Sequence, residues 1–202
     1  MKATGPLAVS FYDRPVVEVA RDLLGCVVRH GSTAGRIVET EAYHCSEPAC
    51  HAYIGLTERT SVLYGPPGLA YVYRSYGIHA MLNVVTEPEG VGAAVLVRAL
   101  EPIDGHGLMA VRRGRHRHRD LCTGPGKLTQ ALGIGLGLNA TGLDGPIEIA
   151  VAPSGEREPD IVTGERVGIT KAVELPWRFC DRGSDCVSAP RPPAMRRARA
   201  KG

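Results

Sequence analysis

The sequence lacks the features that mark a disulfide scaffold, a zinc finger or a membrane protein. Its six cysteines contain no Cys-x-x-Cys pair, and the group Cys45-x4-Cys50-His51 has no second half at zinc-finger spacing. There is no apolar N-terminal stretch of signal-peptide type and no run long enough to cross a bilayer. We therefore expect an intracellular protein with reduced, mostly structural thiols and no bound metal.

Aromatic residues are scarce, at 5% of the chain, and the net charge of +3 is too small to identify a polyanionic partner. Four of the seven tyrosines nevertheless fall between Tyr64 and Tyr76, where a binding site could use them. The positive charge is uneven, with basic runs at 112–119 and 191–201. Such runs either contact phosphates or are solvated segments, and the sequence leaves both interpretations open.

The length and the turn residues predict one mixed domain. A chain of 202 residues suffices for one substantial core, which we place at 11–188, between a loose lead-in at 1–10 and a basic Pro/Ala-rich tail at 189–202. The 25 glycines and 15 prolines indicate many short elements joined by tight turns, and so disfavour a helix bundle. The patterns predict helices at 13–25, 57–64, 104–113 and from 125, and strands at 26–30, 35–43, 70–75, 78–85, 92–101, 147–151 and 166–170.

The strand at 35–43 carries two acids. If it alternates regularly, Ile37, Glu39, Glu41 and Tyr43 share one face, with the two carboxylates about 6–7 Å apart. On an inward face, an acid beside the tyrosine ring would have a raised pKa and could act as a general base near neutral pH. A strand whose acids face water is the commoner case for such a stretch alone.

Three further residues stand out because their surroundings do not suit them. Arg98 interrupts a nearly continuous apolar strand, so a buried guanidinium there requires a carboxylate partner, either Glu41 or Glu39, unless Arg98 reaches solvent from a sheet edge. Asn83 is polar within an apolar strand and should be paired or functional. Tyr76 falls at or near the tip of a predicted hairpin. Exposing a large aromatic ring to solvent there is unfavourable unless the ring inserts into a binding partner.

A glycine turn at 123–126 leads into the helix that begins at 125, with Lys127 on its first turn. Backbone N–H groups, the helix dipole and the ammonium could together hold a phosphate. The P-loop pattern is absent, so we do not expect a nucleoside triphosphate site.

Six motifs occur together: RIVETEAY at 36–43, YGPPG at 64–68, YVYRSYG at 71–77, NVV at 83–85, LVRALEP at 96–102 and LCTGPGKL at 121–128. From about Phe11 to Arg182, their order and spacing resemble the alkyladenine (methylpurine) type of 3-methyladenine DNA glycosylase. The resemblance implies an α+β domain with a curved antiparallel, partly barrel-like sheet, flanking helices and a protruding β-hairpin.

The resemblance also implies a monofunctional DNA repair enzyme without a cofactor. Such an enzyme flips a damaged purine, for example 3-methyladenine or hypoxanthine, out of duplex DNA. It hydrolyses the N-glycosidic bond with an activated water and leaves an abasic site. The implied partner is damaged double-stranded DNA and not a membrane. We expect a monomer, located in the cytoplasm if bacterial and in the nucleus if eukaryotic.

The family's functional residues carry over to matching positions of this sequence. Glu41 would be the general base, with Arg98 and the backbone carbonyl of Val167 helping to hold the water. The nucleobase pocket would comprise Tyr43, His51 and Tyr73 as walls and Asn83 as the residue that crowds the amino group of guanine. Tyr76 would enter the duplex, and the expected contacts to the DNA backbone are Lys127, Arg59, Arg112 and Arg113.

Other classes of function explain less of the sequence. Glu39 and Glu41 on one strand face cannot flank a sugar from opposite sides, as a glycoside hydrolase pair must. A nucleoside hydrolase would have no use for Tyr76 at a hairpin tip. A nucleic-acid-binding module would keep the basic run and the tyrosines but would not need Glu41 or Arg98.

Overall fold

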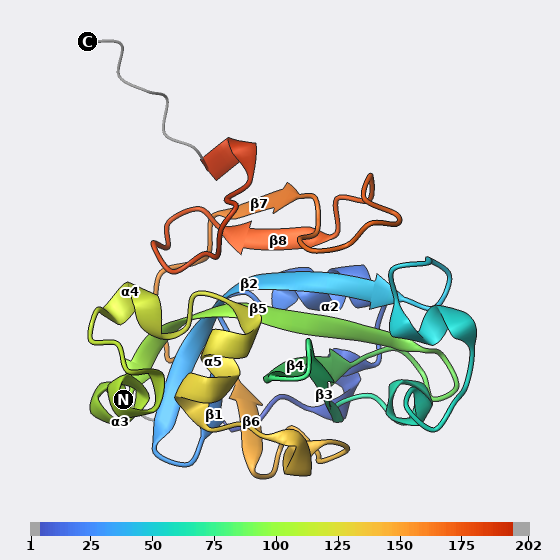
Figure 1. The fold of residues 1–202 in the computed structure, drawn as a ribbon, viewed down its shortest axis with the longest axis horizontal. Coiled ribbons are helices and arrows are strands. Elements are labelled where there is room, and N and C mark those ends of the chain that lie inside the picture. Colours follow the sequence, from blue (N-terminus) through green and yellow to red (C-terminus); the bar gives the residue numbers. More distant parts are fainter. Residues whose placement is uncertain (1–4, 196–202) are drawn as a thin grey trace.

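The computed structural model describes residues 5–195 (Figure 1). The α-helices are α1 (Val9–Tyr12), α2 (Val16–Asp22), α3 (His106–Arg113), α4 (His118–Leu121) and α5 (Pro125–Leu132). The 3-10 helices are η1 (His51–Ile54), η2 (Ser61–Tyr64), η3 (Leu136–Leu138) and η4 (Pro193–Met195). The strands are β1 (Val27–His30), β2 (Thr33–His44), β3 (Ala70–Ser75), β4 (His79–Val85), β5 (Ala93–Asp104), β6 (Ile147–Ala150), β7 (Ile161–Gly164) and β8 (Arg178–Asp181).

The strands of the described region form one antiparallel sheet around β2 and β5, which are the longest. The main path runs β3-β4-β5-β2-β1-β6. The sheet branches at β2, because β1 pairs with residues 33–36 of β2 and β8 with residues 39–41. β7 and β8 form a hairpin above β2 in Figure 1. The sheet is curled into a half-barrel, which confirms the predicted α+β fold.

The largest apolar cluster joins the sheet to α2 and α5. α2 packs on β2 and β5, as its amphipathic pattern predicted. It is shorter than the three turns expected over 13–25, because Pro15 is its N-cap and Gly25, at φ +87°, turns the chain toward β1. The helix expected at 57–64 is reduced to a turn followed by η2.

A bulge in β2 decides which face its side chains occupy. The register shifts between Ile37 and Glu39 leave Val38 as an extra residue opposite β5. Ile37 and Ala42 therefore both face the main core, although regular alternation would put them on opposite faces. The expectation that Ile37 shares a face with Glu41 is wrong for this reason.

The strands predicted at 26–30, 35–43, 70–75, 78–85, 92–101 and 147–151 are confirmed as β1 to β6. The strand predicted at 166–170 is wrong, because this segment is an irregular loop. The Arg166 side chain binds Glu47, and the Val167 N–H binds Glu41 instead of a neighbouring strand. Gly168, at φ +80°, bends the chain directly afterwards.

Parts of both terminal segments pack on the domain. Pro6 bridges to Ala150, and the Leu7 N–H donates to the Ile149 carbonyl. Near the other end, Met195 is buried. Residues 1–4 of the predicted lead-in and 196–202 of the predicted tail lie outside the described residues, and the domain limits at 11 and 188 stay predictions.

Candidate active site

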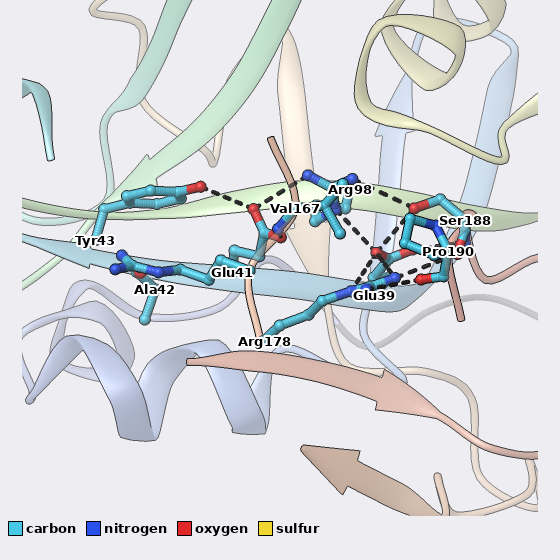
Figure 2. Close-up of polar contacts among 10 residues, drawn as sticks. Glu39, Glu41, Ala42, Tyr43, Arg98, Val167, Arg178, Ser188 and Pro190 are labelled. Atoms are coloured by element: carbon cyan, nitrogen blue, oxygen red, sulfur yellow. Dashed lines mark hydrogen bonds and ion pairs between the residues drawn. The ribbon is translucent and has the colours of Figure 1, made fainter. Parts of the chain in front are cut away.

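Glu41 is a fully buried carboxylate held by three donors (Figure 2). The Tyr43 hydroxyl donates to Oε2 at 2.8 Å, and Nη1 of Arg98 donates to the same oxygen at 3.1 Å. The Val167 N–H donates to Oε1 at 2.7 Å. The sequence-based expectation that Glu41 faces inward beside a tyrosine is confirmed, and the alternative that it faces water is wrong.

Burial raises the pKa of Glu41 above its ordinary value of 4.5. Arg98, the Val167 N–H and the Tyr43 hydroxyl act in the opposite direction, and the charge of Glu39 adds to the increase. Because burial is the largest of these effects, Glu41 is a stronger base than a free glutamate. A carboxylate of this kind suits proton transfer near neutral pH.

Arg98 binds both acids of β2 at once. Its Nε donates to Oε1 of Glu39 at 2.8 Å, while its Nη1 binds Glu41. The Arg98 side chain is 7% exposed, so these are buried ion pairs. The sequence predicted that a buried Arg98 would pair with either Glu41 or Glu39. In the structure Arg98 pairs with both carboxylates.

A cavity of about 350 Å³ lies beside this cluster. Its lining includes seven of the predicted site residues: Tyr43, His51, Tyr73, Tyr76, Asn83, Arg98 and Val167. Tyr43, Arg98 and Val167 also bind Glu41, so the carboxylate lies directly behind the cavity wall. The volume is in the range of small-ligand sites, and the lining is rich in aromatic rings.

His51 and two tyrosines form one aromatic side of the cavity. The rings of His51 and Tyr73 meet edge to face at 4.6 Å, and Tyr71 stacks on Tyr73 at 5.4 Å. Burial lowers the pKa of His51, and the neighbouring Arg59 lowers it further, so both effects favour the neutral imidazole. Arg59 is exposed, with its guanidinium 5.8 Å from the centroid of the Tyr73 ring. Tyr71 is a wall residue that sequence reasoning missed, although its YVY motif contained it.

The match to a family model decides the class of protein. A model described as methylpurine-DNA glycosylase matches residues 10–185. The chain belongs to the methylpurine-DNA glycosylase family. This confirms the predicted enzyme class, a DNA glycosylase of base excision repair that acts on alkylated purines.

Several relatives carry the name "Putative 3-methyladenine DNA glycosylase". The chain is 54% identical to one from Bradyrhizobium diazoefficiens, across 93% of this chain and 92% of that protein. It is 55% identical to one from Methanoculleus marisnigri, across 90% and 98%. A relative from Rubrobacter xylanophilus is 48% identical, across 84% and 90%.

Asn83 of the glycosylase is fixed inside the cavity wall. Its side-chain amide donates to the Tyr71 carbonyl at 3.1 Å and to the Met81 carbonyl at 3.4 Å. The residue is 5% exposed. The expectation that this polar strand residue is paired is confirmed, and its amide cannot swing away without losing both bonds.

Arg166 supports the Tyr43 wall and was not indicated by the sequence. Its guanidinium lies 4.7 Å from the centroid of the Tyr43 ring and 5.4 Å from that of Trp177. Its Nη1 and Nη2 donate to the carboxylate of Glu47 at 2.6 and 3.1 Å, and the Arg166 side chain has no exposure. Arg166 and Glu47 are 119 residues apart in irregular segments, so no periodic pattern links them.

The β3–β4 hairpin and the start of α5 also contribute to the cavity lining. Ser75, Tyr76 and Pro125 line the cavity. Tyr76 is 87% exposed at the hairpin tip, where it and Gly77 have φ values of +49° and +72°. The predicted hairpin and the place of Tyr76 in it are confirmed.

The residues expected to contact the DNA backbone differ in their surroundings. Lys127 is exposed on the first turn of α5, the helix whose first residue, Pro125, lines the cavity. Arg112 donates to the Ala131 carbonyl at 3.0 Å, and Arg113 donates to the Leu121 carbonyl at 3.0 Å. Phosphate contacts by these residues and by Arg59 stay predictions.

Among residues 5–195, no group of three or more His, Cys, Asp or Glu side chains could hold a metal ion. The six cysteines are free. No helix of the described chain is long and apolar enough to cross a membrane.

Proposed function

We propose that the chain releases 3-methyladenine, hypoxanthine and similar damaged purines from duplex DNA by hydrolysis and leaves an abasic site. The observation that supports this most is the placement of Glu41. It is a buried carboxylate behind an aromatic cavity, anchored by Arg98 and with a raised pKa.

In the proposed reaction Glu41 accepts a proton from water while the water oxygen bonds to C1′ of the flipped nucleotide. The C1′–N bond breaks, and its electron pair leaves with the nucleobase. Oε2 of Glu41 already accepts two hydrogen bonds, whereas Oε1 accepts one, from Val167. We therefore assign the water to Oε1, where the carbonyl of Val167 could also hold it.

The aromatic lining suits the proposed substrate. Stacking on tyrosine or histidine contributes about 1–3 kcal/mol per nucleobase, which offsets much of the cost of flipping. A 3-methyladenine nucleotide is cationic, so electron-rich rings such as Tyr43 and Tyr73 favour it. It also leaves as a neutral base. Hypoxanthine is a poorer leaving group because it needs a proton.

A module that only binds nucleic acid would explain the surface but not the interior. Burying Glu41 and Arg98 costs desolvation energy, and a carboxylate near a phosphate backbone weakens binding. A hydrolase for free nucleosides would not need Tyr76 exposed on a hairpin.

The direct test is product analysis on a panel of duplexes, each with one 3-methyladenine, hypoxanthine or undamaged purine. We expect the free damaged base and an abasic strand as products. Binding without release from any duplex would contradict the proposal and favour the binding module.

We further propose that the enzyme acts as a monomer on double-stranded DNA. It would act in the cytoplasm of a bacterium, or in the nucleus of a eukaryote. Sedimentation of the protein with and without a lesion duplex tests the oligomeric state.

Asn83→Ser should admit guanine to the cavity. The fixed amide of Asn83 crowds the exocyclic amino group of guanine, and the shorter serine removes that obstacle. We expect guanine release from undamaged duplex DNA to rise about tenfold, which corresponds to about 1.4 kcal/mol. Adenine lacks that amino group and is the matched control, so its release should not change. Unchanged guanine release would count against this role of Asn83.

Lys127→Ala should make DNA binding less sensitive to salt. If Lys127 contacts one phosphate, the slope of log affinity against log salt becomes shallower by about 0.9. Arg21→Ala, which removes an exposed cation on α2, is the control and should leave the slope unchanged. Equal slopes for Lys127→Ala and wild type would remove Lys127 from the interface.

A further inference from the structure

Glu39, the second acid of β2, is as buried as Glu41, and neither carboxylate is part of the cavity lining. Its Oε1 accepts hydrogen bonds from Nε of Arg98 at 2.8 Å, Nε of Arg178 at 2.9 Å and Oγ of Ser188 at 2.9 Å. Its Oε2 accepts from the Ser188 N–H at 2.7 Å. With four donors bound, Glu39 serves as an anchor and is not available to activate water.

The anchor fixes the orientation of Arg98. Figure 2 shows Arg98 between Glu41 on one side and Glu39 with Ser188 on the other. A guanidinium is a rigid planar fork, so holding Nε on Glu39 determines where Nη1 points. Nη2 also lies 3.4 Å from Oγ of Ser188. These contacts direct Nη1 to Glu41.

The chain after β8 completes the anchor from a distant part of the sequence. Ser188 is 149 residues from Glu39. Arg178 holds this segment in place, because it donates to the Pro190 carbonyl at 2.9 Å and the Ser188 carbonyl at 3.2 Å. The segment 188–190 is therefore part of the support of the site.

The charges of the cluster are balanced between two carboxylates and two guanidiniums. In the described chain, Glu39 and Glu41 are the carboxylates within ion-pair distance of Arg98. Without the charge of Glu39, Arg98 would be left with Glu41 alone. The charge of Glu39 also raises the pKa of Glu41, whereas Arg98 lowers it. Glu39 therefore helps to keep Glu41 basic.

We propose that Glu39 is a positioning residue of this enzyme: with Arg178 and Ser188, it fixes Arg98 so that Arg98 orients Glu41 without neutralising it. The inference rests on the proposed function of Glu41 as the general base. Glu39 and the segment 188–190 take no direct part in the proposed chemistry. Their role is to position Arg98.

Glu39→Gln tests the proposal through the rate and the pH profile of base release from a 3-methyladenine duplex. We expect the single-turnover rate to fall about 10- to 100-fold, as when a group that orients a functional ligand is removed. The acidic limb of the profile should move to lower pH, because losing the charge of Glu39 lowers the pKa of Glu41. Affinity for the duplex should not change.

Glu101→Gln is the matched control. Glu101 is on the neighbouring strand β5 and pairs with Arg36 at 2.7 Å, outside this cluster. A purely structural role for Glu39 would lower thermal stability in Glu39→Gln without moving the rate or the acidic limb of the folded protein. That result would overturn the proposal. Absence of release from wild type would instead overturn the proposed function.

Ser188→Ala decides the question if Glu39→Gln does not fold. It removes the hydroxyl between Glu39 and Arg98 but keeps the backbone N–H bond to Glu39. We expect a rate loss of about 3- to 10-fold, in keeping with one lost hydrogen bond to a charged group. Ser184→Ala is its control, because Ser184 is a buried serine between β8 and the segment 188–190 and accepts a bond from the Cys186 N–H. Equal rates for the two serine variants would overturn the proposal.

Discussion

Glu41→Gln is expected to abolish base release from a duplex that carries 3-methyladenine or hypoxanthine while leaving duplex binding nearly intact. An amide of the same shape cannot accept the proton of the attacking water. General bases typically contribute 10²- to 10⁴-fold, so we expect a rate loss of at least about a hundredfold. Three donors surround the side chain, and Gln would present its NH₂ group to one of them. Some loss of thermal stability is therefore expected as well.

The measurement is a single-turnover assay with enzyme in excess, together with the dissociation constant for the same duplex. Glu101→Gln again serves as the control, because it removes a carboxylate outside the site. Release by Glu41→Gln at the wild-type rate would exclude Glu41 as the general base.

The pH dependence of the wild-type rate tests independently whether Glu41 is the general base. Only ionised Glu41 can accept a proton, so the rate should fall as the pH drops through its pKa. Because burial raises that pKa, half-maximal activity on the acidic side should lie above 4.5, the value of an ordinary glutamate. An acidic limb at or below that value would contradict the buried, proton-accepting carboxylate.

The sequence predicted those parts of the site that depend on a local pattern of neighbouring residues. Arg98 in an apolar strand indicated a carboxylate partner if it was buried, and Glu41 lies on the strand that pairs with it. Tyr76-Gly77 between two strand-like runs indicated a hairpin. In the structure both residues have positive φ values, as a tight two-residue hairpin turn needs. Gly124-Pro125 likewise marked the start of α5.

The parts that the sequence did not predict depend on contacts between distant, irregular segments. Arg166 and Glu47 meet across 119 residues, and Ser188 and Glu39 across 149. Such loops have no periodicity, so nothing in their local pattern indicates which partner they reach. The bulge at Val38 is a third case, because an extra residue in one strand depends on the register of its neighbour.

Tyr76 is expected to carry the other large effect, on recognition of the lesion and not on chemistry. Tyr76 is 87% exposed, and its backbone is at φ +49°, a strained value for a residue with a large side chain. Strain of this kind costs about 1–3 kcal/mol and persists where function needs it. An exposed ring that borders the cavity suits insertion into the gap that a flipped nucleotide leaves.

Tyr76→Ala should therefore weaken binding to a lesion duplex about 10- to 100-fold, since stacking on an aromatic side chain contributes about 1–3 kcal/mol per base. Tyr76→Phe keeps the ring and should bind as wild type does. A single strand with the same lesion has no stack to fill, so Tyr76→Ala and wild type should bind it equally. If Tyr76→Ala loses affinity for the single strand as well, the ring contacts the nucleotide itself. If it keeps full affinity for the duplex, another side chain fills the gap.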